Sequence, residues 1–376
     1  MISTELSIPV KEYKKRLRVL KKKMIESKID VLIVDQTEHI GYFTGYVPTA
    51  AMYQTCIVPV DGDPLIILRA LDEAAFLEQS PYRSYVMFND WEDSIQVLID
   101  TFKDRGWDKK RVGLELDSHF LLPMRYEAIK AGLSDATICD FSGVMWEMRL
   151  KKSPLEIECL RNAGRIADEA TLECIKVAEE GVLERSIASA AYDKALHLGA
   201  DNTRMLLMTS GNRPGAFHGT LGHHQLEKGD VVHLELIPHF CGYTARIMRP
   251  IVIGQPSARQ KEVAEMIIRF QDEQLGAMKP GAVASDVDRI LREQMLHSGL
   301  AETYPNATGY TLGYILVPRT SDFTRVFLPN SDWILEEGMV FHMYTGAEGL
   351  AFSETVVITQ DGHERLTNLD RKLFIK

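Results

Sequence analysis

A helix start near the middle of the chain is the feature that most constrains its fold. Ser153 and Glu156 have the spacing of a capping box, and Pro154 occupies the first helical position. Residues 147–152 before it are predicted to be a linker. A chain of 376 residues interrupted in this way is expected to form two domains, residues 1–146 and residues 147–376.

The first domain is predicted to alternate strands and helices. Apolar residues recur every three or four positions over residues 10–28, which indicates an amphipathic helix. Strands are predicted for the β-rich runs 30–35, 56–60, 64–69 and 111–116. Helices are predicted near 93–104 and 119–131. This order predicts an α/β domain with a covered sheet, closing near residues 141–146.

The second domain is predicted to mix helices with longer strands. The helices are expected near 154–178, 184–197, 257–278 and 285–298. The strands are expected near 205–210, 231–237, 243–253, 339–344 and 352–359. No low-complexity segment interrupts this part of the sequence.

The charge and the apolar content exclude several classes of partner. A formal net charge of −10 and a pI of about 5.6 disfavour binding to nucleic acid or to an anionic membrane. No apolar run approaches the ~18 residues of a spanning helix, and the polar N-terminus does not resemble a signal peptide. Five scattered cysteines without a CxxC pair are typical of reduced thiols. We therefore expect a cytoplasmic protein.

Three glycine-containing motifs near the C-terminus carry a family resemblance. They are Thr308-Gly309-Tyr310-Thr311-Leu312-Gly313-Tyr314, Glu337-Gly338-Met339-Val340-Phe341 and Ser353-Glu354-Thr355-Val356. With the linker pattern Arg149-x-x-Lys152-Ser153-Pro154, the sequence resembles the prolidase, methionine aminopeptidase and creatinase superfamily along essentially its whole length. The resemblance implies an α/β N-terminal domain plus an α+β C-terminal pita-bread domain with a curved, mainly antiparallel sheet. It also implies a homodimer.

The resemblance implies a two-metal site that the residues of this chain do not reproduce. The family positions hold two aspartates, one histidine and two glutamates, which offset the repulsion between two divalent ions. Here they hold Glu235, Arg246, Tyr310, Tyr344 and Ser353. The charges of the one glutamate and the one arginine cancel, and a guanidinium repels a bound cation. We therefore predict no metal and no cofactor.

His218 is the strongest candidate for a catalytic residue. It precedes Lys228 by ten residues, the distance at which metal-free members similar to creatinase and ectoine hydrolase have a histidine. An imidazole that titrates near neutrality can take a proton from water and return it to a leaving nitrogen. The alternative is a loop histidine without a catalytic role.

Glu235 lies on a predicted strand and shares one face with His233 and Ile237. One interpretation is a carboxylate that orients the substrate or attacks an amide or amidine carbon. The other is an ion pair with Arg246 that fills the former metal site, and an arginine there would keep the glutamate ionised. Both remain open from the sequence, and Arg246 is also a candidate for binding substrate.

Four more residues of the C-terminal half complete the predicted pocket. Tyr310 and Tyr344 are expected either to donate hydrogen bonds to a developing oxyanion or to plug the former metal cavity. Glu354 is expected to be a pocket carboxylate that pairs with a cationic substrate group. Arg319 and His342 are expected near the mouth of the pocket as substrate-binding residues.

Tyr53 is the one candidate from the N-terminal half. It lies in the loop of residues 44–54, which in creatinase supplies an arginine that binds the substrate carboxylate of the partner subunit. Tyr53 takes that place here as a substrate-binding candidate. The alternative is that Tyr46 and Tyr53 pack this loop against their own domain.

The leading hypothesis is a metal-independent hydrolase of a C–N bond in a small, zwitterionic substrate, similar to ectoine hydrolase and creatinase. His218, Glu235, Tyr310, Tyr344 and Glu354 would form its catalytic site. One alternative is a non-catalytic binding protein on a peptidase fold. The other is an Xaa-Pro dipeptidase, which the ligand positions argue against.

Overall fold

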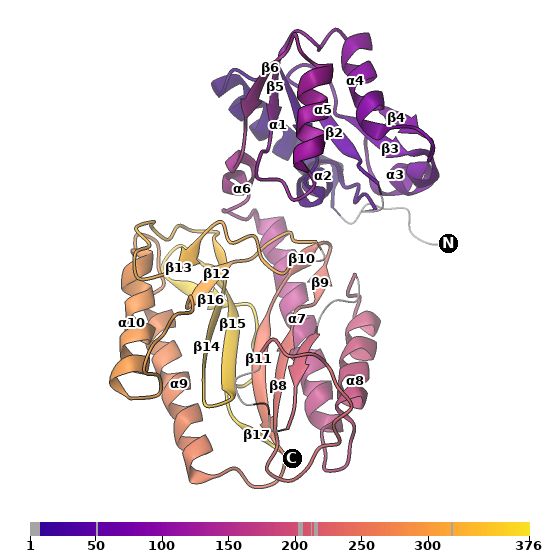
Figure 1. Cartoon of the computed structure of the whole chain (residues 1–376). Coiled ribbons are helices and arrows are strands. Elements are labelled where there is room, and N and C mark those ends of the chain that lie inside the picture. The colour runs from indigo at the N-terminus through magenta and orange to yellow at the C-terminus, as the bar shows by residue number, and fades with distance from the viewer. Residues whose placement is uncertain (1–7, 50–51, 202–205, 212, 214–216, 317–318) are drawn as a thin grey trace. The chain divides into compact units, whose positions relative to one another are not determined.

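The computed structural model describes residues 8–49, 52–201, 206–211, 213, 217–316 and 319–376. It divides into two compact units, Met1–Met148 and Arg149–Lys376 (Figure 1). The division falls two residues beyond the boundary expected from the linker, since the short helix that ends at Met148 belongs to the first unit.

The N-terminal unit is an α/β domain around one mixed sheet. Its elements are α1 (Val10–Glu26), β1 (Val31–Val34), α2 (Thr37–Thr44), β2 (Thr55–Pro59), β3 (Leu65–Arg69), the 3-10 helix η1 (Ala70–Asp72), α3 (Glu73–Gln79), β4 (Tyr85–Phe88), α4 (Ser94–Asp104), β5 (Arg111–Leu114), α5 (Pro123–Gly132), β6 (Thr137–Asp140) and α6 (Val144–Met148). The sheet order is β4-β3-β2-β1-β5-β6. The pairs β3–β4, β1–β5 and β5–β6 are parallel and the other two are antiparallel.

Apolar periodicity places α1 correctly, because its Tyr13, Leu17, Leu20 and Met24 are buried. The strands β4 and β6 were not predicted. They lie at the two edges of the sheet, and all but one of their residues are partly buried or exposed, so neither shows a clear apolar pattern. The helix α2 was also not predicted, because it is buried on every side and shows no amphipathic face.

The C-terminal unit contains four long helices and a large sheet. Its elements are α7 (Pro154–Val177), α8 (Glu184–His197), β7 (Leu206–Thr209), β8 (Val231–Leu236), β9 (His239–Phe240), β10 (Tyr243–Thr244), β11 (Ile247–Val252), α9 (Ala258–Gly276), α10 (Ala284–His297), β12 (Gly309–Thr311), β13 (Val326–Phe327), β14 (Val340–Ala347), β15 (Leu350–Ile358), β16 (His363–Arg365) and β17 (Phe374–Ile375). The capping box at Ser153 and Glu156 is formed as predicted.

The large sheet has the order β13-β12-β14-β15-β11-β8-β7, and all of these neighbours are antiparallel. Two αβ halves contribute to it, one with α7 and α8 and the other with α9 and α10 (Figure 1). Alternate residues of β8, such as Val232 and Leu234, pack with α7 and α8 in one core cluster. Phe352 of β15 packs with α9 and α10 in another. The opposite face of the sheet is therefore left for a pocket.

The predicted strand over 243–253 is broken into β10 and β11. At the break, the Arg246 N–H donates to the Thr355 hydroxyl at 2.7 Å, and that hydroxyl donates to the Arg246 carbonyl at 2.9 Å. The Thr355 side chain therefore takes the place of the backbone hydrogen bonds between strands at this position and fixes the backbone of Arg246.

No helix among the described residues combines the length and the apolar character that crossing a membrane requires.

Candidate active site

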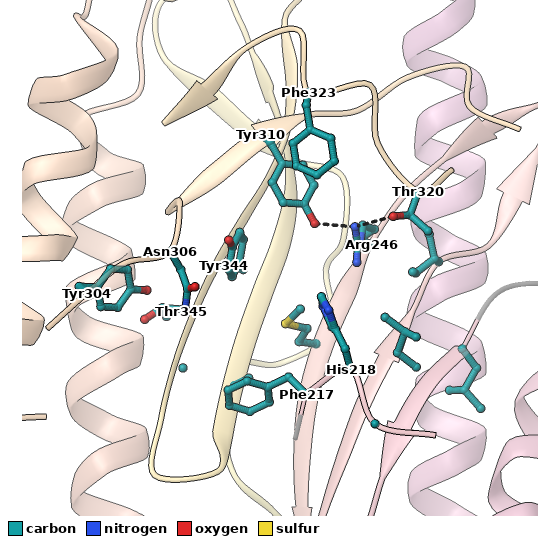
Figure 2. Close-up of a pocket in the computed structure, with 17 residues that line it drawn as sticks. Phe217, His218, Arg246, Tyr304, Asn306, Tyr310, Thr320, Phe323, Tyr344 and Thr345 are labelled. Carbon is teal, nitrogen blue, oxygen red and sulfur yellow. Dashed lines mark hydrogen bonds between the residues drawn. The ribbon is translucent and has the colours of Figure 1, made fainter. Parts of the chain in front are cut away.

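A pocket lies on the face of the large sheet away from the four long helices. Its cavity volume is about 910 Å³, within the usual range of small-molecule sites. Four of the predicted residues line it, namely His218, Arg246, Tyr310 and Tyr344 (Figure 2). The two tyrosines form part of the wall of this cavity.

The Glu235 carboxylate and the Arg246 guanidinium form an ion pair behind this pocket. Arg246 Nη2 donates to Glu235 Oε1, and the exposed fraction is 3% for the Arg246 side chain and 0% for the Glu235 side chain. Burial is the largest single influence on Arg246 and lowers its pKa, but Glu235, Tyr310 and Tyr344 together outweigh burial and raise the pKa of the guanidinium. Glu235 does not line the pocket. The ion-pair interpretation of Glu235 is thus the one that the contacts support, and an attacking carboxylate is not.

Arg246 also orients a hydroxyl in the pocket. Its Nη1 donates to the Tyr310 hydroxyl at 2.5 Å and to Thr320 Oγ1 at 3.4 Å (Figure 2). Burial raises the pKa of Tyr310 to about 12, although Arg246 opposes this shift. Burial also raises the pKa of Tyr344 above its ordinary value. Both phenols therefore keep their protons at neutral pH and can donate to a substrate oxygen.

The strand register explains why these residues face the same space. Glu235 pairs with Met248, Met248 with Ser353, and Ser353 with Tyr344, so the four form one row across β8, β11, β15 and β14. Residues directly opposite each other in a sheet project from the same face. Met248 and Tyr344 line the pocket, which shows that this row points toward it.

Two buried histidines lie near His218. His218 is exposed on a turn, and its ring extends into the space below Arg246 (Figure 2). Burial is the main cause that lowers the pKa of His233 to about 4, with Glu235 opposing this shift and His218 adding to it. Burial also lowers the pKa of His342 well below its ordinary value, with Arg246 and His218 acting in the same direction. Both buried imidazoles are therefore neutral at neutral pH, which leaves His218 as the exposed histidine of the pocket.

Glu354 is not a pocket carboxylate, contrary to the sequence-based expectation. Its side chain is fully buried and accepts from Arg249 Nη2 at 2.7 Å and from Thr367 Oγ1 at 2.5 Å. Ser353, its neighbour in β15, belongs to the row that faces the pocket. Adjacent residues of a strand project from opposite faces, so Glu354 points to the helix side of the sheet.

Two weaker candidates also lie outside the lining of the pocket. The Arg319 guanidinium donates to the carbonyls of Ser321 and Asp322 in its own loop. His342 is not at the mouth. It is fully buried, with its ring stacked on Tyr344 at a centroid distance of 5.2 Å. His342 therefore supports the wall of the pocket from beneath.

Tyr53 is described within the N-terminal unit alone. Its hydroxyl donates to Asp35 at 2.9 Å, and the Arg125 guanidinium lies 4.6 Å from its ring centroid. Tyr53 also belongs to the hydrophobic core of that unit. These contacts match the packing alternative for this loop, part of which, residues 50–51, lies outside the described residues.

Several pocket residues were not predicted from the sequence. Phe217, Met248, Asn306, Thr320 and Phe323 line the cavity. Met248 follows Arg246 by two residues within the strand expected over residues 243–253, so period-two alternation was a signal for it. Phe217 is the neighbour of His218 in the sequence. No sequence pattern marked Asn306 or Phe323.

The residues of this face do not fit a pair of divalent metal ions. Glu235 supplies the single carboxylate among the five family ligand positions, and Arg246 already neutralises it. Among the described residues, no three side chains of His, Cys, Asp or Glu come close enough together to share a metal ion. A divalent pair needs several hard, anionic oxygen ligands, and this donor set lacks them.

Comparisons with known proteins agree with this architecture. The model of metallopeptidase family M24 matches residues 158–360, and that of the creatinase/prolidase N-terminal domain matches residues 16–151. The chain therefore belongs to metallopeptidase family M24, a family of hydrolases, and has its two-domain fold.

Named relatives include enzymes of two kinds. The chain is 27% identical over 369 residues to the Xaa-Pro dipeptidase of Pyrococcus furiosus, covering 96% of this chain and 100% of that one. It is 25% identical over 400 residues to the ectoine hydrolase of Halomonas elongata, covering 100% of both. The crystal structure of an X-Pro aminopeptidase from Thermotoga maritima matches with a TM-score of 0.85 at 23% identity, covering 96% and 99% of the two chains. This last likeness shows the fold.

Proposed function

We propose that this chain hydrolyses a C–N bond in a small molecule with its own side chains as the catalytic groups. The observation that carries the proposal is the position of His218, an exposed imidazole at an open cavity whose far wall presents the hydroxyl of Tyr310. An acid/base group and hydroxyl donors at one cavity are what hydrolysis of an amide or amidine requires.

The steps balance with water as the only co-reactant. His218 takes a proton from water while the water oxygen attacks the carbon of the C–N bond. Tyr310 and Tyr344 donate hydrogen bonds to the oxygen or nitrogen on which negative charge develops. The C–N bond then breaks, and His218 returns its proton to the leaving nitrogen. In this scheme the buried Glu235 holds Arg246, which in turn holds the Tyr310 hydroxyl.

The second candidate is an Xaa-Pro dipeptidase. The likeness to the Pyrococcus furiosus dipeptidase over the full length of that enzyme favours it, and other dipeptidases match at similar identity. Among the possible scissile bonds, these relatives favour a peptide bond more strongly than any other. Against it stands the donor set around Glu235 and Arg246, which does not suit a metal pair.

One experiment separates the candidates. The purified protein is stripped of metal and assayed on Xaa-Pro dipeptides, cyclic amidines, guanidino acids and acylated diamino acids, before and after adding Mn²⁺ or Co²⁺. His218→Ala is assayed beside it, with His223→Ala, an exposed histidine of the same loop that does not line the pocket, as the matched control. We expect metal-free turnover that falls by about 10²–10⁴ in His218→Ala and is unchanged in His223→Ala.

The other outcomes are equally informative. Turnover of Xaa-Pro dipeptides that requires added metal and is lost in chelator would establish the dipeptidase and overturn the proposal. Thermal stabilisation by a compound that neither protein turns over would establish a binding protein without catalysis. Equal turnover by wild type and His218→Ala would remove His218 from the mechanism.

A further inference from the structure

The pocket is poor in negative charge. None of its described lining residues is Asp, Glu or Lys, and Arg246 is the one lining residue with a permanent charge. The residues of the C-terminal unit that lie outside the described ranges also include no Asp or Glu. A cationic substrate group would therefore find no carboxylate in the lining that this unit provides.

The carboxylates behind the pocket are already neutralised. Glu235 is bound to Arg246, and Glu354 is bound to Arg249 on the opposite face of the sheet. The charge of Arg246 is in turn offset by Glu235, so neither an ammonium nor a carboxylate group meets an uncompensated opposite charge at this wall. The expectation that Glu354 pairs with a cationic substrate group therefore loses its support.

Beneath the lining lies a set of uncharged polar atoms without hydrogen-bond partners among the described residues. They are both ring nitrogens of His233, both ring nitrogens of His342 and the hydroxyl oxygen of Ser353. The three side chains are 0–3% exposed. By register His342 on β14 and Ser353 on the adjacent strand β15 lie close together, whereas His233 is on β8, beyond β11. Buried polar atoms are nearly always satisfied in folded proteins, so the pair Ser353 and His342 indicates that a ligand group or water completes it.

Ser353 is the member of this set closest to the cavity by register. It pairs with Met248 on one side and with Tyr344 on the other, and both of these line the pocket. Methionine is unbranched and flexible, so a small displacement of Met248 would bring Ser353 into contact with a bound molecule. Its hydroxyl can both donate and accept, and so can each neutral imidazole.

We propose that the pocket selects substrates whose bound polar group is uncharged, such as a carboxamide, and that Ser353 and His342 form the subsite for that group. This inference rests on the proposed function and names its substrate class. An uncharged amide supplies donors and acceptors to this subsite and avoids the cost of burying an unpaired ion. The apolar walls from Phe217, Met248 and Ile237 would contact the rest of the substrate.

Three compounds with one skeleton test the charge selectivity. N-acetyl-L-leucinamide is neutral, L-leucinamide is a cation at pH 7, and N-acetyl-L-leucine is an anion. Binding to metal-stripped wild type is measured by calorimetry, and hydrolysis is followed separately by mass spectrometry. Selectivity and turnover are thus independent results. We expect the neutral compound to bind at least about tenfold more tightly than either charged one.

Each other result overturns the proposal. Tighter or equal binding of L-leucinamide would mean that a carboxylate reaches the pocket after all. Tighter or equal binding of N-acetyl-L-leucine would mean that Arg246 serves as an anion site. Binding of none of the three at millimolar concentration would remove the carboxamide as the recognised group, whatever the outcome for catalysis.

Substitutions at Ser353 test the subsite itself. Ser353→Ala is expected to weaken binding of N-acetyl-L-leucinamide about three- to tenfold, the effect of losing one hydrogen bond. Ser80→Ala, at a buried serine of the N-terminal unit, is the control and should leave binding unchanged. Ser353→Asp places a carboxylate beside the pocket and is expected to favour L-leucinamide over the neutral compound. Unchanged affinity in Ser353→Ala would place the recognised group elsewhere.

Discussion

Glu235 and Arg246 are joined by a hydrogen-bonded ion pair at two positions where relatives of this fold are expected to bind metal. The pair spans β8 and the break before β11, and both side chains are buried. It links the hydroxyl of Tyr310 to the core of the sheet through one guanidinium. The pair thus buries two opposite charges at these positions, and its contribution to stability follows from that burial.

Removing one member of this ion pair should destabilise the protein more than replacing both members with apolar residues. Glu235→Ala leaves the Arg246 charge buried without its partner and is expected to cost about 3–5 kcal/mol. Glu235→Leu combined with Arg246→Met leaves no charge behind and should cost less than the single change. Urea unfolding of the wild type and these variants measures both effects. A double variant as unstable as the sum of the single ones would contradict this account of the pair.

Glu354 should affect stability without affecting the pocket. Its partners Arg249 and Thr367 lie on the helix side of the sheet, so Glu354→Gln leaves a buried guanidinium uncompensated. We expect a loss of about 3 kcal/mol in unfolding free energy, with ligand affinity at 25 °C unchanged within about twofold. Chemical denaturation and calorimetry measure the two quantities. A loss of ligand affinity in Glu354→Gln without a loss of unfolding free energy would show that Glu354 contributes to the pocket.

His233 should make the protein less stable in acid. Its pKa falls from an ordinary value of 6.5 to about 4 in the folded chain, mainly through burial. Between these values the unfolded chain binds the proton and the folded chain does not. The contribution of His233 is therefore complete above about pH 6.5 and is lost as the pH falls toward 4, by up to about 1.4 kcal/mol per pH unit.

The comparison with His233→Asn isolates this effect. The variant lacks the titrating group, so the difference in unfolding free energy between wild type and variant should shrink or reverse from pH 7 to pH 4.5. Other groups, such as Asp168 with a burial-raised pKa of about 6, titrate equally in both proteins and cancel. A constant difference across this range would show that His233 titrates in its ordinary range when folded.

Helix α7 approaches the segment after β16 too closely for a side chain at Gly164. A Cβ there would lie 2.0 Å from the Leu366 carbonyl oxygen. Gly164→Ala should therefore lower the unfolding free energy by roughly 1–3 kcal/mol. Gly276, the last residue of α9, has nothing within 4 Å of such a Cβ. Gly276→Ala is the control and should be neutral or stabilising by about 0.5–1 kcal/mol. Equal thermal shifts for both would contradict the close approach.

Much of the fold followed from local patterns. The helix predicted at residues 184–197 is α8 with the same bounds, and the capping box at Ser153 starts α7. The predicted strand at 243–253 is interrupted because Thr355, over a hundred residues later, binds the backbone of Arg246. A contact of that separation leaves no trace in the local pattern. The edge strands β4 and β6 were not predicted for a different reason, since their partly exposed residues show no clear apolar pattern.

Motif order and spacing were sufficient to identify the family, the two domains and the residue types at the family's metal-ligand positions. Which of the neighbours Ser353 and Glu354 faces the pocket could be seen only in the folded chain. Strand side chains alternate with a period of two, so an assignment that is wrong by one residue moves a group to the opposite face. The register of β15 against β11 and β14 settles it, placing Ser353 toward the pocket and Glu354 against Arg249.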